Sequence, residues 1–228
     1  SGDANDFQVH IIVKSVPQSQ TRAKSFRSLD FFETEINFYN KVWPQLDAFQ
    51  KSKKLPELFD SIPLCLATFA DGKTDFIALE DLSYQGFKAL ERSLGLDLDA
   101  ALFTLKYFAK FHAIAVAYRE QHPDEFKKMD EELKETYFDE KFRGWYHGTM
   151  DKLCTVIKDA AEKELPPSYL EKIEHIFSQD LYGNISLSLK KRTGLTAITH
   201  GDCWPPNFLI QEQDGSKKLA LIDFQLSR

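Results

Sequence analysis

The segment THGDCWPPNFLI (199–210) places Asp202 two residues after His200 and Asn207 five residues after Asp202, and a second aspartate, Asp223, follows in ALIDF. A carboxylate can take the proton of an attacking hydroxyl, and carboxylate and amide oxygens are the ligands that Mg²⁺ prefers. Transfer of a phosphoryl group from ATP needs a base at the acceptor and metal ions held against the phosphates. The pattern therefore predicts Asp202 as the catalytic base and Asn207 and Asp223 as metal ligands.

A β-hairpin explains why the second aspartate follows so soon. NFLIQEQ (207–213) and LALIDF (219–224) have the composition of strands, and DGSK (214–217) between them contains the Asp-Gly pair typical of hairpin turns. Because the second strand returns along the first, we expect Asp223 to lie beside Asn207. The two predicted metal ligands would then meet.

Two charged residues near the start of the chain complete this set. Lys14 stands inside the apolar strand segment HIIVKSV, and Glu35 stands on the helical segment that follows. Lys14 could reach the α and β phosphates of ATP, and Glu35 could pair with it. A lone Lys in a strand is usually an edge residue, and a lone Glu on a helix usually faces solvent. Their order along the chain, before HxDxxxxN and IDF, favours the functional interpretation.

The first part of the chain predicts a small β-rich region with one helix. FQVHIIVKSV (7–16) reads as a strand that stops at Pro17. Apolar residues recur at helical spacing from Ser25 to Lys41, and Pro44 just beyond is expected to end that helix. IPLCLATFA (62–70), the turn DGK (71–73) and DFIALEDL (75–82) predict a β-hairpin.

The remainder predicts mainly helices. LDAALFTLKYFAKFHAIAVAYRE (98–120) has the pattern of a long amphipathic helix. Two or three more helices are expected between about 125 and 190, broken near Gly144 and at Pro166-Pro167. The predicted class is α+β with two lobes: a β-rich ATP-binding lobe at 1–82, and a mainly helical lobe at 83–228 that carries the catalytic loop 199–210 and the DFQ segment 223–225.

Composition excludes some functions and places the protein in a reducing environment. The net charge of -6 argues against a general nucleic-acid binder, which needs clustered Lys and Arg. The three cysteines are scattered without a CxxC spacing, so neither a disulfide framework nor a zinc site is indicated. Apolar runs such as HAIAVA are too short to span a bilayer. We therefore expect a cytoplasmic, monomeric protein that does not bind membranes.

Several segments together resemble one family. HGD followed by Asn is the signature of kinase-like enzymes that phosphorylate small molecules, the group of aminoglycoside phosphotransferases and choline kinases. HGDCWPPNFLI, LIDFQLSR with Gln225 where protein kinases carry Gly, FIALEDLSYQGF and LKYFAKFHAIAVA more narrowly resemble the ecdysteroid-kinase-like (CHK-kinase-like) family. The resemblance runs from Lys14 to Arg228.

The resemblance implies a two-lobed protein-kinase-like fold, ATP and Mg²⁺ as cofactors, and a hydroxyl of a small molecule, such as an ecdysteroid, as phosphate acceptor. The main-chain groups of Glu80 and Leu82 would then bind adenine. The family also has a glycine-rich loop before the lysine and helices after the DFQ segment. We therefore expect a chain truncated at both ends.

Alternatives stay open at this point. His200 is interpreted as a support for the catalytic loop rather than a base, and Trp204 either lines the acceptor site or packs. Cys203 is not interpreted as a nucleophile, because no His and Asn arrangement supports it. A noncatalytic ATP-binding protein of the same fold is the main rival function. A protein kinase is disfavoured, because HGD replaces HRD and no APE-like segment is present.

Overall fold

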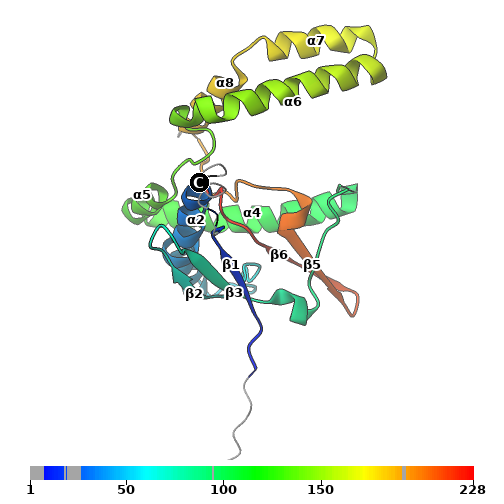
Figure 1. Ribbon diagram of the computed structural model, residues 1–228. Helices are drawn as coiled ribbons and strands as arrows, with labels where there is room; N and C mark the ends of the chain where they lie inside the picture. Colours follow the sequence, from blue (N-terminus) through cyan, green and yellow to red (C-terminus); the bar gives the residue numbers. More distant parts are fainter. Residues whose placement is uncertain (1–7, 18, 20–26, 94, 192–193) are drawn as a thin grey trace, which may run out of the picture. The chain divides into compact units, whose positions relative to one another are not determined.

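The chain forms two compact units in a computed structural model that describes residues 8–17, 19, 27–93, 95–191 and 194–228. The first unit comprises Ser1–Lys134 and Ala197–Arg228, and the second comprises Glu135–Thr196. Figure 1 labels helices and strands of both units. Mixed helices and small antiparallel sheets fit the predicted α+β class. The lobe boundary at 82/83 falls inside the first unit and stays a prediction.

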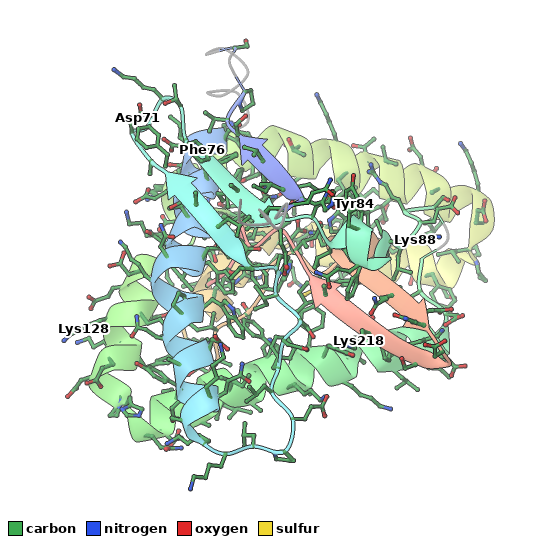
Figure 2. The ribbon with its side chains drawn as sticks, turned by 90° about the horizontal axis from the view of Figure 1, so that it is seen from below. Asp71, Phe76, Tyr84, Lys88, Lys128 and Lys218 are labelled. Atoms are coloured by element: carbon green, nitrogen blue, oxygen red, sulfur yellow. The ribbon has the colours of Figure 1, made fainter. Side chains whose placement is uncertain are left out.

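A three-stranded antiparallel sheet begins the first unit. Its order is β1 (Ile11–Ser15), β3 (Phe76–Glu80) and β2 (Cys65–Phe69), with Lys14 opposite Ile77. The hairpin predicted over 62–82 is confirmed by the pairing of β2 with β3. In Figure 2, Asp71 and Phe76 mark its tip. The first strand is shorter than the predicted 7–16, and Phe7 lies outside the described residues.

The helix after this strand is longer than predicted. It runs as α2 (Ser28–Asn37), a π-helical turn η1 (Phe38–Val42) and α3 (Trp43–Ser52), so the expectation that it ends before Pro44 was wrong. Pro44 stands in the first turn of α3, after the widened π-helical turn, where a missing N–H is tolerated. The predicted start at Ser25 lies outside the described residues.

Helix α4 (Leu98–Gln121) confirms the long helix predicted at 98–120, and α5 (Pro123–Glu132) follows it. The Asp97 side chain accepts a hydrogen bond from the Ala100 N–H and caps α4. Among the described residues, α4 is the one helix long and apolar enough to cross a membrane by length and composition. Such a helix alone is weak support for a membrane span. One face of α4 is buried in this unit, with Phe111 fully covered.

A second antiparallel sheet carries the predicted catalytic segments. After η2 (Leu82–Gln85), strand β4 (Lys88–Ala89) pairs with β5 (Phe208–Gln213), which pairs with β6 (Ser216–Leu221). The predicted second hairpin is therefore confirmed. Its two-residue turn, Asp214-Gly215, has φ angles of 51° and 74°, as a type I′ turn requires. Lys218 marks β6 in Figure 2.

The second unit contains η3 (Glu140–Phe142), α6 (Arg143–Glu164), α7 (Pro167–Phe177) and α8 (Leu181–Lys190). With α5, the described part of the predicted helical region holds four α-helices rather than two or three. The break at Pro166-Pro167 is confirmed, since Pro166 caps α7. Gly144 does not break a helix, because it stands in the first turn of α6.

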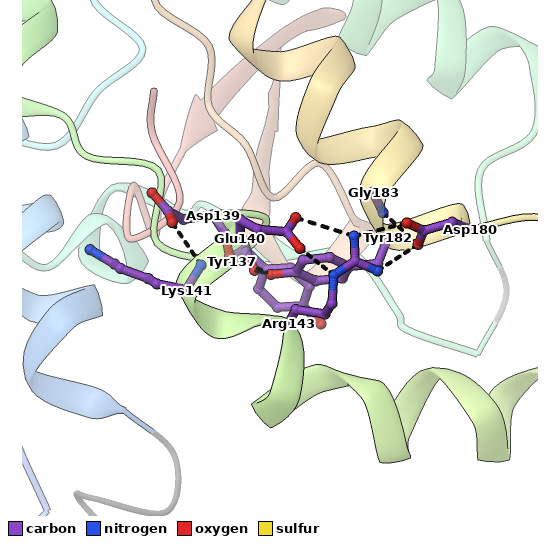
Figure 3. A network of polar contacts seen from close by, with 8 residues as sticks. All are labelled: Tyr137, Asp139, Glu140, Lys141, Arg143, Asp180, Tyr182 and Gly183. Carbon is purple, nitrogen blue, oxygen red and sulfur yellow. Dashed lines mark hydrogen bonds and ion pairs between the residues drawn. The ribbon is translucent and has the colours of Figure 1, made fainter.

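A polar network joins the starts of α6 and α8 (Figure 3). Arg143 pairs with both Glu140 and Asp180, while the Tyr182 hydroxyl donates to the main-chain carbonyls of Tyr137 and Asp139. The Arg143 guanidinium and the Gly183 N–H hold the pKa of Asp180 down to about 2. Glycine at 183 leaves room for this pair, because a Cβ there would lie 2.1 Å from Asp180 Oδ2. The network fixes the second unit locally.

Candidate active site

Lys14 joins two carboxylates that lie far apart in the sequence. Its Nζ lies 2.6 Å from Glu35 Oε2 and 2.6 Å from Asp223 Oδ1. Lys14 stands on strand β1 and Glu35 on helix α2. Asp223 follows the last strand of the β5–β6 ribbon, two residues after β6 ends. The structure thus contains the Lys14–Glu35 ion pair that the sequence predicted, and it adds a direct contact with Asp223.

The charges of this cluster do not cancel. The Glu35 side chain is 1% exposed and shares one ammonium group with Asp223. Burial lowers the pKa of Lys14, but the charges of Glu35 and Asp223 outweigh it and raise this pKa above its ordinary value. Burial, aided by the charge of Asp223 and opposed by Lys14, raises the pKa of Glu35. The cluster therefore carries surplus negative charge, which suits an additional cation.

A cavity of about 330 Å³ opens beside the cluster. Five predicted site residues line it: Lys14, Glu35, Glu80, Leu82 and Asp223. Most of the remaining wall is apolar, formed by Ile12, Pro63, Leu79, Phe87, Ala89, Leu209 and Ile222. An apolar pocket with a few convergent polar groups is the usual form of a small-molecule site. We call it the nucleotide cavity, after the prediction that Lys14, Glu80 and Leu82 bind ATP.

Asp202 and Asn207 do not line this cavity but are joined to each other on the neighbouring loop. Asn207 Nδ2 donates to Asp202 Oδ2 at 3.1 Å and to the Asp202 carbonyl at 3.1 Å. The Ile222 N–H donates to the Asn207 carbonyl, so the loop is tied to the residue before Asp223. Because both partners of the amide nitrogen are acceptors, the nitrogen must face them. This leaves the amide oxygen of Asn207 as an acceptor.

The metal-ligand set is small. Within the described parts of the chain, no three His, Cys, Asp or Glu side chains gather as a metal site. Mg²⁺ usually keeps several waters and takes one or two protein ligands together with phosphate oxygens. The carboxylate of Asp223 and the free amide oxygen of Asn207 fit such a site, and the surplus negative charge beside Lys14 favours it.

His200 positions the catalytic loop through both ring nitrogens. Its Nε2 lies 2.8 Å from the Ile222 carbonyl oxygen, which can only accept, so Nε2 carries the proton. Its Nδ1 accepts the main-chain N–H of Asp202 at 3.2 Å. The ring is fully buried and packs 4.6 Å from Phe224. These contacts require a neutral imidazole, which agrees with a supporting role rather than that of a base.

Stability is expected to fall below pH 6.5 because of His200. Burial lowers its pKa from the ordinary 6.5, against the Ile222 hydrogen bond and the charges of Asp202 and Asp223. Between that lower pKa and 6.5, the unfolded chain binds a proton that the folded chain does not. Stability therefore decreases with falling pH, by up to about 1.4 kcal/mol per pH unit for one such group.

This effect is measured by urea denaturation of the wild type and a His200→Gln variant. The pH range of about 5 to 8 brackets the titration of a histidine. Glutamine keeps a donor for the Ile222 carbonyl but does not titrate. Below pH 6.5, the free energy of unfolding of the wild type should fall more steeply with falling pH than that of the variant. Parallel curves would show that His200 does not control acid stability. His112, whose pKa is lowered by burial, remains in both proteins and cancels in the comparison.

Gly201 lets the loop pass against the end of the chain. Thr199 and Arg228 exchange main-chain hydrogen bonds of 2.9 and 3.4 Å, so the two segments lie side by side. Gly201 has φ 83°, and a Cβ there would lie 1.8 Å from the Leu226 carbonyl oxygen. This position therefore needs glycine both for its backbone conformation and for space.

A Gly201→Ala variant should be strongly destabilised and lose activity. The left-handed backbone alone costs about 1–2 kcal/mol for alanine, and the clash with a main-chain oxygen adds to this. Thermal melting should show a clear drop. Gly215→Ala, which also has a positive φ but open space around the added Cβ, is the control and should lose less. Equal losses would mean that the Leu226 contact is unimportant.

Asp223 has a left-handed backbone with φ 68°, which is uncommon for a residue other than glycine. Its neighbour Phe224 is fully buried and stacks on Phe38 with ring centroids 3.8 Å apart and planes at 6°. This packing holds the strained residue in place. Strained backbone that is kept by its surroundings is often found at functional sites.

Arg92 is a residue that the sequence interpretation missed. Its guanidinium carbon lies 4.9 Å from the ring centroid of Trp204, two residues after Asp202. Trp204 is 37% exposed, so its indole is not simply a core residue. No spacing links Arg92 with Trp204 in the sequence. Burial raises the pKa of the neighbouring Cys203 thiol, which does not favour a nucleophile there.

Comparison with known proteins identifies the family of this chain. No curated protein and no solved structure matched the chain. A family profile did match, and the match covers residues 1–228, which include the Lys14 cluster and the Asp202 loop. That profile describes the ecdysteroid kinase-like family, as the resemblance of the sequence segments had predicted. The chain therefore belongs to the ecdysteroid kinase-like family.

Proposed function

We propose that this protein transfers the γ-phosphate of ATP to a hydroxyl group of a small molecule. The main support is the Lys14 bridge to Glu35 and Asp223, which lies in the wall of a cavity large enough for a nucleotide base. The family match supports a small-molecule kinase at family level. The individual residue roles are part of the proposal, and the contacts of Lys14 and Asn207 support them.

Adenine occupies the apolar part of the nucleotide cavity in this proposal. Leu82 begins the short helix η2, and the first N–H groups of a helix have no partner within it. In this proposal the Leu82 N–H and the Glu80 carbonyl bind the edge of the base, since the Glu80 N–H already donates to the Leu64 carbonyl. The Glu80 side chain accepts the Leu64 N–H at 2.9 Å, which fixes this segment.

In the proposed reaction, the Lys14 cluster binds the nucleotide and the Asp202 loop acts on the acceptor. Lys14, oriented by Glu35, holds the phosphates of ATP once its contact with Asp223 is exchanged. Asp202 accepts the proton of the acceptor hydroxyl as that oxygen attacks the γ-phosphorus, and ADP leaves. Asn207 and Asp223 would hold Mg²⁺, which neutralises charge on the phosphates.

The acceptor in this proposal is an uncharged or weakly charged hydroxylated lipophilic molecule, for which an ecdysteroid is one candidate. Trp204 offers a large apolar surface next to the base, which suits a flat ring. Arg92 places positive charge against that indole. A polycationic aminoglycoside would be repelled there, so it is disfavoured as a substrate.

The test is a screen of metabolite fractions, hydroxylated steroids and aminoglycosides for ATP-dependent mass gain of one phosphate. We expect hydroxylated lipophilic compounds to gain the mass of one phosphate. Phosphorylation of aminoglycosides without any turnover of steroids would contradict the acceptor class. Tight binding of ATP without turnover of any acceptor would instead support the rival noncatalytic binding protein.

A further inference from the structure

A second cavity, of about 370 Å³, shares part of its wall with the nucleotide cavity. The two share Pro63 and Glu80 in their walls, but the second is lined from the other side by η1, α3 and the segment before β2. Neither Lys14 nor Asp223 lines it. It is therefore a distinct cavity, although Glu80, whose main chain is proposed to bind adenine, stands in both walls.

Aromatic side chains form one part of this second cavity. Tyr39, Trp43 and Phe59 line it, and the rings of Trp43 and Phe59 meet edge to face with centroids 5.9 Å apart. Tyr39 belongs to the π-helical turn η1, a feature often found at functional sites. Tyr39 and Phe59 are buried, whereas Trp43 is partly exposed. Trp43 is therefore the ring that a ligand can reach, and the face of an indole attracts organic cations.

The charged side chains at this cavity are mostly acidic. Three carboxylates, from Asp47, Asp60 and Glu80, line it with one ammonium, from Lys51. Lys51 already pairs with Asp47 at 2.5 Å, and Glu80 accepts the Leu64 N–H. The Asp60 side chain is exposed and also lines another cavity together with Glu80, and it has neither a hydrogen bond nor an ion pair with any residue that the structure describes. The cavity thus combines a net negative charge with one carboxylate that is free to bind.

We propose that this cavity is a second small-molecule site, which binds an organic cation: an amine or quaternary ammonium group on a small apolar or aromatic body. The partly exposed indole of Trp43 would contact the ligand, while Asp60 would supply the opposite charge. An anionic ligand would meet the surplus carboxylates. A metal ion would lack a ligand set, since no three acidic or His and Cys side chains gather as a metal site among the described residues.

Benzyltrimethylammonium is a suitable probe, and benzyl alcohol is its neutral counterpart. Titrations are followed in ¹⁵N–¹H spectra through the three indole N–H signals, of Trp43, Trp145 and Trp204, assigned with single Trp→Phe variants. The Trp43 signal should move with the cationic probe, and the Trp145 and Trp204 signals should stay. No nucleotide is added, so the result does not depend on kinase activity.

The charge of Asp60 supplies the second test. An Asp60→Asn variant should bind the probe about fivefold more weakly, as expected for loss of one exposed charge pair. Asp159→Asn, an equivalent change at an exposed site on α6, should leave affinity unchanged. The proposal is overturned if millimolar probe leaves Trp43 unmoved, if benzyl alcohol binds as tightly, or if Asp60→Asn has no effect.

Discussion

An Asp202→Asn variant is expected to lose phosphoryl transfer by a factor of about 10² to 10⁴, because a positioned base contributes that much to the rate. The substitution leaves the loop intact. Asn207 donates to Asp202 Oδ2, and an asparagine at 202 still offers an oxygen to accept that hydrogen bond. The loss should therefore come from the missing base and not from a displaced loop.

Nucleotide affinity separates these two explanations. Asp202 does not line the nucleotide cavity, so calorimetry should give nearly the same ATP affinity for the variant and the wild type. The melting temperature should also change little. Near wild-type turnover in the variant would remove Asp202 from its proposed role, and a parallel loss of ATP affinity would show that it acts on the nucleotide instead.

An Asp223→Asn variant should lose the Mg²⁺-dependent part of ATP binding. Asparagine tolerates the left-handed backbone at this position, so the change removes the charge and keeps the conformation. Loss of one partner of a close charge pair costs about 2 kcal/mol or more, at least thirtyfold in affinity. Folding should survive, because Lys14 keeps Glu35 and the surplus negative charge is gone.

Asp214→Asn is the matched control. Asp214 also has a positive φ, of 51°, and stands in the turn of the same β5–β6 ribbon, but it does not line the nucleotide cavity. Calorimetry with and without Mg²⁺ compares the two variants. If Asp223→Asn binds Mg-ATP as tightly as Asp214→Asn does, the metal site has been assigned to the wrong residue.

Local patterns predicted part of this fold well. Asp214-Gly215 was predicted as a hairpin turn, because its residue types suit the two positive φ angles that the structure shows. The helix at 98–120 followed from its apolar spacing. The prediction that the helix ends before Pro44 was wrong. The buried residues Val42 and Leu46 on either side favour continuing the helix, and a π-helical turn accommodates the proline. That preference depends on tertiary packing.

The pairing of site residues could be predicted where the residues stand on elements that follow one another in the sequence. Lys14 and Glu35 stand on adjacent elements, so their pairing could be inferred from a strand followed by a helix. The Lys14 contact with Asp223 could not, since 209 residues separate them and only the fold sets the distance. The hydrogen bonds of His200 and the stacking of Arg92 on Trp204 likewise depend on packing between distant segments. The sequence indicated a supporting role for His200 but not its hydrogen-bond partners, and it gave no signal for Arg92.

In the proposed function, this chain moves the γ-phosphate of ATP to a small hydroxylated molecule by means of Asp202. The most direct measurement incubates wild type and Asp202→Asn in parallel with γ-labelled ATP, Mg²⁺ and a mixture of hydroxylated metabolites, then follows the label. The label should pass to a small-molecule product with the wild type and remain in ATP with the variant. Equal transfer by both proteins, or label that stays in ATP with the wild type for every acceptor, would contradict the account.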